Sequence, residues 1–228
     1  MRCRKSSLRG LQTGHVAVGA NSSVISQILA RAIHNPRRAR PGVRVSVHEG
    51  LVSLLIEPLA TGKLDFVVGG IPENCGDLLL HREPLYWDDL IVVCRPDHPI
   101  LARRKRTLES LLDFPWALSS HAEPARIALE QAFRAQGLKP PAPDVTANTS
   151  HCLVSAVLEG DVLSFLPRRL IHRAESNNVL ATVPIKGLQC RRRIEIAYCQ
   201  RNTLSPAAGA LAGEVAKVCE SLGLRAAA

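Results

Sequence analysis

Short strand-like runs alternate with segments of helical period along this chain, and this alternation constrains the fold more than any other sequence feature. The run at residues 15–20 places its apolar side chains on one face, as in a strand that lies against a core. A polar turn follows, and apolar residues at helical spacing predict a helix over residues 24–34 that Pro36 and Pro41 end. Alternating valines at residues 43–47 predict a second strand. Strand, helix and strand in this order make a βαβ unit, which favours the α/β class.

The rest of the chain repeats this order without repeating the sequence. The predicted elements are a helix at 51–60, strands at 64–70, 78–85 and 89–95, a helix at 109–113, a strand at 116–119, a helix at 124–136, a strand at 144–147, a helix at 152–159, a strand at 162–166, a short helix after it, a strand at 193–199 and a helix at 206–222. Aromatic residues supply only 4% of the chain, so Leu, Val, Ile and Ala must fill the core. Such a core suits parallel sheets flanked by helices.

The size of the chain allows one sizeable hydrophobic core or two small ones, since it has 228 residues of which 46% are hydrophobic. No apolar segment follows the basic residues 1–10, and no run reaches the ~20 apolar residues of a membrane span. Seven scattered cysteines fit reduced structural thiols. We therefore expect a globular protein of the cytoplasm that has no membrane partner.

The chain is basic, with 29 Lys and Arg against 20 Asp and Glu and a formal charge of +9. Its positive residues cluster at 37–40, 103–106 and 191–193. Such a field favours anionic ligands or nearby nucleic acid, although solvated arginine-rich loops would give the same pattern. No aromatic residues interleave the clusters, and no helix-turn-helix or zinc-finger pattern accompanies them, so charge alone does not make this chain a DNA reader.

Six short segments resemble the LysR-type transcriptional regulators, and the resemblance extends over about residues 11–222. They are LQTGH at 11–15, PGV at 41–43, GKLD at 62–65, RPDHPI at 95–100, AVLEGDVLSFLP at 156–167 and LSPAA at 204–208. Each segment is common by itself. Their order and spacing together make the resemblance specific.

The resemblance implies a fold of two Rossmann-like lobes of the type 2 periplasmic-binding-protein kind, joined by two crossing segments with a cleft between them. Lobe I would contain residues 12–93 and 200–224, and lobe II residues 94–199. Residues 1–11 would be a remnant of the family's linker helix, and the N-terminal winged helix-turn-helix is missing from this sequence. Family members form homodimers, or tetramers in the full-length form. DNA contact is expected only through the missing N-terminal domain.

A candidate anion site lies at the predicted start of the first helix, in Asn21, Ser22 and Ser23. The first N–H groups of a helix are unsatisfied and the dipole is positive there, so anions bind readily. One of these residues could equally be an N-cap and the others loop residues. The resemblance favours the ligand reading, because effector carboxylates in the family are commonly bound at this turn. Gly50 and Gly69 would let a ligand approach the backbone, or are turn glycines.

In the second lobe the matching positions are Ser119 and Ser120, after one strand, and Asn148 and Thr149, after another. Open α/β sheets bind ligands at such strand ends, although helix capping would explain the same hydroxyls. Phe165 would supply an apolar wall to the site, or it belongs to the core.

Signals for catalysis and for metal binding are poor. The chain has no G-x-S-x-G elbow, P-loop, G-x-G-x-x-G or H-E-x-x-H, and none of its cysteines has the C-x-x-C spacing of a zinc site. We therefore expect no catalytic residues, no metal and no cofactor. The leading hypothesis is the effector-sensing and dimerisation domain of a transcriptional regulator that binds a small anionic metabolite, with a carboxylate group. A solute-binding protein of a transport system is the alternative, and an enzyme on the same fold is disfavoured.

Overall fold

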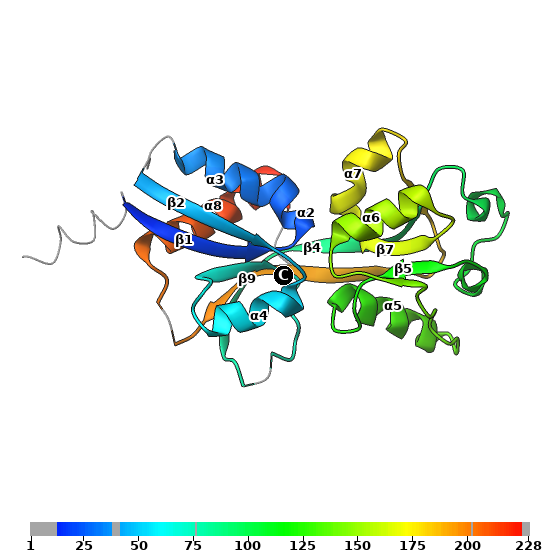
Figure 1. Cartoon of the computed structure of the whole chain (residues 1–228), viewed down its shortest axis with the longest axis horizontal. Coiled ribbons are helices and arrows are strands. Elements are labelled where there is room, and N and C mark those ends of the chain that lie inside the picture. Colours follow the sequence, from blue (N-terminus) through cyan, green and yellow to red (C-terminus); the bar gives the residue numbers. More distant parts are fainter. Residues whose placement is uncertain (1–12, 38–41, 76, 202, 225–228) are drawn as a thin grey trace, which may run out of the picture. The chain divides into compact units, whose positions relative to one another are not determined.

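The computed structural model describes residues 13–37, 42–75, 77–201 and 203–224. The chain divides into two compact units (Figure 1), of which unit 1 comprises the residues up to Trp87 and those from Arg193 onward, and unit 2 comprises Asp88–Arg192. Two strands, β4 (Leu80–Cys94) and β9 (Cys190–Cys199), begin in one unit and end in the other. The division therefore falls inside these strands, at positions other than the residues 93–94 and 199–200 expected from the sequence. No loop marks the change of unit along the chain.

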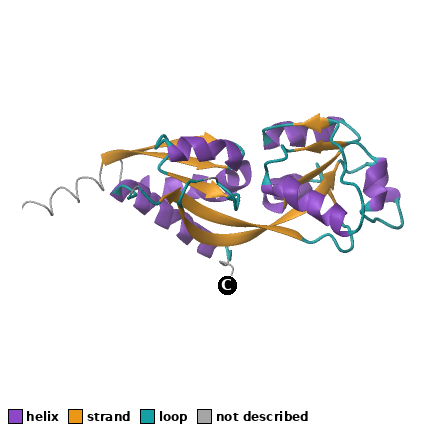
Figure 2. Cartoon of the chain, turned by 90° about the horizontal axis from the view of Figure 1, so that it is seen from below, coloured by secondary structure: helices purple, strands orange, loops and turns teal. Residues whose placement is uncertain are grey.

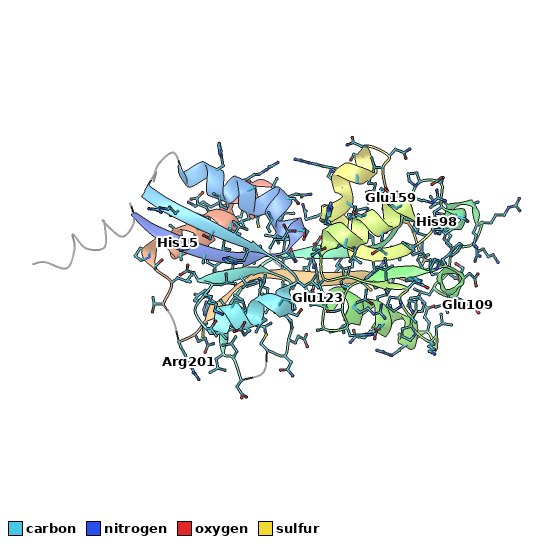
Figure 3. All side chains as sticks on the ribbon, viewed as in Figure 1. His15, His98, Glu109, Glu123, Glu159 and Arg201 are labelled. Atoms are coloured by element: carbon cyan, nitrogen blue, oxygen red, sulfur yellow. The ribbon has the colours of Figure 1, made fainter. Side chains whose placement is uncertain are left out.

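Unit 1 is a mostly parallel sheet with helices on both faces. Its further elements are β1 (Thr13–Ala20), a continuous helical run made of α2 (Ser22–Val24), η1 (Ile25–Leu29) and α3 (Ala30–Arg37), β2 (Gly42–Glu49), α4 (Val52–Ala60), β3 (Phe66–Gly69) and α8 (Pro206–Ser221). The strands follow the order β2-β1-β3-β9-β4. β1 runs parallel to β2 and β3, and β9 is antiparallel to β3. His15, labelled in Figure 3, lies on β1. Its Nε2 atom is 2.8 Å from the hydroxyl of Ser46 on β2.

Alternation along β1 decides which helices cover each face of this sheet. Val16 and Val18 are fully buried on the face that packs under η1, α3 and α8. Ala17 points to the other face and packs with residues of α4. Figure 1 shows α3 and α8 on one side of the unit 1 sheet and α4 on the other. The predicted strand-helix-strand order and the shared face of the β1 side chains are confirmed.

Unit 2 has the same layered construction (Figure 2). Its elements are η2 (Pro99–Ala102), η3 (Glu109–Asp113), β5 (Trp116–Leu118), α5 (Pro124–Ala135), β6 (Val145–Thr146), α6 (Ser150–Glu159), β7 (Leu163–Pro167), α7 (Arg168–Ser176) and β8 (Ala181–Val183). The strands follow the order β4-β7-β5-β6, with β8 paired to β4. β5 runs parallel to β6 and β7. One face packs against α5, and the other against α6 and α7.

β4 corrects the sequence prediction, which divided it into two strands at residues 78–85 and 89–95. The pair Asp88 and Asp89 is typical of a turn, but here the two carboxylates pair with β9. Asp88 Oδ2 lies 3.1 Å from Arg192 Nη2, and Asp89 Oδ1 lies 2.9 Å from Arg191 Nε. These nonlocal ion pairs keep the segment extended, so a single strand results. β8 was not predicted at all.

Candidate ligand-binding site

The three parallel strands of unit 1 end at one edge of its sheet. The register pairs Ala20 at the end of β1 with Glu49 on β2 and with Val68 on β3. The Gly50 N–H donates to the Ala20 carbonyl at 3.2 Å. The carboxyl ends of parallel strands in open α/β sheets are where ligands bind. The structure thus brings the predicted residues of the first lobe, Asn21, Ser22, Ser23, Gly50 and Gly69, to a single edge.

Gly69 has a packing role at this edge. A Cβ atom at Gly69 would lie 2.6 Å from Val52 Cγ2 and 3.3 Å from Asn21 Nδ2. The first distance is far below van der Waals contact, so a side chain here would push α4 away from the strand end. At Gly50 a Cβ would meet only Leu55, at 3.7 Å, which is an ordinary contact. Close approach of the backbone is therefore required at Gly69 and not at Gly50.

Asn21 is the N-cap of the helical run that follows β1. Its Oδ1 accepts from the Val24 N–H at 3.2 Å and from the Ser23 hydroxyl at 3.0 Å. Asn21 is 7% exposed and Ser23 is 2% exposed. The capping role that the sequence allowed for this turn is thus present. The other amide atom, Asn21 Nδ2, is buried and has no hydrogen-bond partner among the described residues. Buried donors are nearly always satisfied, so this one calls for an explanation.

A carboxylate that the sequence reasoning missed also lies at this edge. The Ser22 hydroxyl donates to Glu49 Oε1 at 2.5 Å, and the Glu49 side chain is exposed. Glu49 is the last residue of β2, and its charge lies beside the positive end of a helix, which is a favourable place. The only sequence signal was its position just before Gly50 at the end of an alternating run.

The helix behind the turn includes a π-helical segment, η1, that the sequence did not predict. The Ala30 N–H bonds to the Ile25 carbonyl, five residues back. π-Helical turns are rare and occur frequently at functional sites. Ile28 and Leu29 within this segment are fully buried, which fixes the helix against the sheet.

In unit 2 the predicted polar residues also meet at an edge formed by parallel strands. Leu118 pairs in register with Thr146, so Ser119 and Ser120 follow β5 beside the residues that follow β6. Both serines are half-buried, whereas Asn148 and Thr149 are exposed. Thr149 is the N-cap of α6, and its hydroxyl accepts from the Cys152 N–H at 3.2 Å.

Phe165 is placed differently from these hydroxyl groups. It is 4% exposed and packs in the core that α5 covers, paired in register with Val92 on β4. This helix starts after Glu123, which is labelled in Figure 3. The buried position of Phe165 makes it a support of the sheet.

Charged residues that the sequence did not single out follow the end of β7. Arg168 and Arg169 come directly after Pro167, at the edge where β5 also ends. Asp88, 1% exposed on β4, is held by Arg192. Burial raises the pKa of the Asp88 carboxyl, and the charges of Arg192 and Arg169 oppose that rise. The surroundings of Asp88 thus include the guanidinium groups of Arg192 and Arg169 and the carboxylate of Asp89.

No three His, Cys, Asp or Glu side chains among the described residues come together as a metal site would require. No helix in the described part of the chain is long and apolar enough to cross a membrane.

Two layered α/β units, joined by two strands and each ending in a polar edge of parallel strands, define a domain with the fold of the type 2 periplasmic-binding-protein kind. Residues 9–220 match the family model described as the LysR substrate binding domain, and the chain belongs to this family. The predicted fold class and family are confirmed.

Curated relatives are transcriptional regulators. GalR of Pseudomonas putida is 30% identical over 206 residues, which are 90% of this chain and 52% of GalR. GbpR of Azospirillum brasilense is 24% identical over 197 residues, 86% of this chain and 58% of GbpR. The chain thus spans about half the length of these regulators. Nothing in these relatives supports the transport alternative.

Solved structures share the fold. The effector binding domain of QuiR in complex with shikimate has a TM-score of 0.78 at 18% identity, and covers 92% of this chain and 98% of its own. The regulatory domain of Synechocystis CcmR in complex with 2-PG has a TM-score of 0.80 at 16% identity, with 92% and 99% covered.

Proposed function

We propose that this chain senses a small carboxylate effector for a transcriptional regulator, and that Asn21 is the central residue of the effector site. The observation that carries the proposal is the buried Asn21 Nδ2, which lacks a partner among the described residues at an edge where three parallel strands end. The QuiR and CcmR domains, solved with shikimate and with 2-PG, support a ligand of this kind.

The physics of the turn favours an anion. The first N–H groups of the helical run have no intrahelical acceptor, and the helix dipole places positive charge there. A hydrogen bond to a charged group contributes about 1.5–3 kcal/mol. The formal charge of +9 also draws anions toward the protein from a distance.

The remaining candidate residues would contribute in different ways. Ser22 and Ser23 would form the turn around the ligand, Gly50 would leave space after β2, and Gly69 would let Val52 and Asn21 approach the end of β3. In unit 2, Ser119, Ser120, Asn148 and Thr149 would supply further donors, with the positive charge of Arg169 nearby. Phe165 would act from the core as packing support.

The regulator as a whole is proposed to be a cytoplasmic homodimer, or a tetramer in full-length form. DNA would be contacted by a part of the regulator outside this domain, since the matched region is only 52% of GalR and 58% of GbpR.

Asn21→Asp tests the site. Asp caps a helix as well as Asn, so the Val24 N–H keeps its acceptor, but the donor at Nδ2 is replaced by a second acceptor oxygen. A thermal-shift screen of small carboxylates, including shikimate and 2-phosphoglycolate, would first find a ligand. A compound at 100 times its Kd adds about 2.7 kcal/mol to stability. Asn21→Asp should then weaken binding of that compound by about tenfold or more.

The matched control is Ser205→Asp, which makes the same cap-conserving change at the start of α8, where the Ser205 hydroxyl accepts from the Ala208 N–H at 3.2 Å. It adds the same charge at a helix start, and it should leave affinity unchanged. Equal affinity of Asn21→Asp and the unchanged protein would show that Nδ2 does not contact the effector.

A further inference from the structure

Glu49 places a negatively charged hydrogen-bond acceptor at the unit 1 edge, which a simple anion site would lack. Its carboxylate accepts from the Ser22 hydroxyl at 2.5 Å, and it belongs to the residue paired in register with Ala20, immediately before Asn21. The side chain is exposed to solvent. A carboxylate offers about four lone-pair positions, of which the Ser22 bond occupies one, so Glu49 can accept further hydrogen bonds from a ligand.

The second observation is the buried amide of Asn21. Its Nδ2 has no partner among the described residues and lies 3.3 Å from the position of a Cβ at Gly69, the last residue of β3. A donor on Asn21 and a charged acceptor on Glu49 therefore flank Ser22 at the same sheet edge. A ligand that satisfies both must carry an acceptor and a donor.

A carboxylate with no donor beside it would be a poor occupant. It could accept from Asn21 and from the helix N–H groups, but it would meet the like charge of Glu49 at the same sheet edge. A hydroxyl elsewhere on the same ligand that reaches Glu49 replaces this repulsion with a hydrogen bond, and hydrogen bonds to a charged partner are the strong ones. An ammonium group would also serve as a donor. The formal charge of +9, however, favours ligands of net negative charge over zwitterions.

We infer that Glu49 is a specificity residue of the effector site and that the effector is a hydroxylated carboxylic acid. This inference rests on the proposed function, since it concerns the same edge of unit 1.

Two pairs of acids, each matched in its ring and carboxylate, test the inference. They are shikimate with 1-cyclohexene-1-carboxylate, and 3,4-dihydroxybenzoate with benzoate. Titration calorimetry on the unchanged chain should show the hydroxylated acid of at least one pair bound about tenfold more tightly than its partner. In Glu49→Gln the preference should fall to about threefold or less, and the plain acid should bind more tightly than before because the like charge is gone.

Glu57→Gln is the control, since Glu57 is an exposed carboxylate on α4 in the same unit and its substitution changes the net charge equally. It should leave the preference unchanged. The preference is the ratio of two Kd values measured on the same protein sample. An unfolded fraction of a variant changes both values equally and cancels in the ratio. Equal binding of plain and hydroxylated acids, or a preference that survives Glu49→Gln, overturns the inference and leaves the proposed function standing. Failure of all these acids to bind below about 1 mM counts against the carboxylate effector itself, and against this inference with it.

Discussion

Gly69→Ala should destabilise unit 1 and distort the candidate site. The new Cβ would lie 2.6 Å from Val52 Cγ2, and Val52 is 1% exposed and packed among Leu55, Leu59 and Val67, so it has little room to move. Overpacking of this kind costs about 1–3 kcal/mol. For a chain of this length, 1 kcal/mol corresponds to about 2–4 °C in Tm, so the melting temperature should fall by about 2–12 °C.

Two variants test whether the clash with Val52 causes the loss of stability. Gly69→Ala combined with Val52→Ala removes the clashing methyl group. The double variant should therefore lose less stability than the sum of the losses in the two single variants. Gly213→Ala on α8 is the matched glycine control, because a Cβ there meets nothing within 4 Å. In an exposed helix this change should raise stability by about 0.5–1 kcal/mol. Calorimetric or circular-dichroism melting gives the values. If Gly69→Ala melts at the same temperature as the unchanged chain, the close approach at this strand end is not a constraint.

Three further outcomes are expected. Light scattering at tens of micromolar should report a homodimer. Val47→Arg should weaken it, because β2 is the edge strand of unit 1 and Val47 is 41% exposed; a monomeric unchanged chain would contradict this. Burial lowers the pKa of the His98 imidazole from 6.5, so the folded state disfavours the proton that the unfolded chain binds. Stability should therefore be full above about pH 6.5 and fall as the pH drops below it. His98→Asn keeps an acceptor for the Ile100 N–H and should weaken the dependence of stability on pH, measured by urea unfolding at several pH values. An equally steep dependence on pH in this variant would exclude His98 as the cause. DNA retained by this chain should be released by salt regardless of sequence, and sequence-dependent retention at physiological salt would contradict that.

Local sequence patterns were enough to predict most elements of both units. The strand at β1, the polar turn and the helix after it could be assigned because a change of period from 2 to 3.6 is visible within a few residues. Gly62 and Gly137 end their elements with positive φ values of 74° and 72°, as expected of stop residues. The polar edges could be predicted for the same reason, since each follows a recognisable strand.

Features that depend on pairing between distant segments could not be read in this way. β4 continues through Asp88 and Asp89 because arginines about a hundred residues later neutralise them. The Ser22–Glu49 bond depends on the register of β1 against β2, and a shift of one residue would turn Glu49 to the other face of the sheet. The need for glycine at position 69 likewise arises from α4, which no local pattern places against that strand.

The capping and ligand readings of the Asn21 turn, which the sequence offers as alternatives, are compatible once the two amide atoms are considered separately. Oδ1 is used by the helix, through the Val24 N–H and the Ser23 hydroxyl. Nδ2 is on the same planar group, so the cap also fixes the direction of the unpartnered donor. A helix start that is held by its own cap loses little further freedom when an anion binds, and preorganised donors of this kind bind more tightly than mobile ones. Loss of the cap should therefore lower both stability and affinity, whereas loss of the donor alone should lower only affinity. This difference is why Asn21→Asp is a sharper test of the effector site than removal of the side chain.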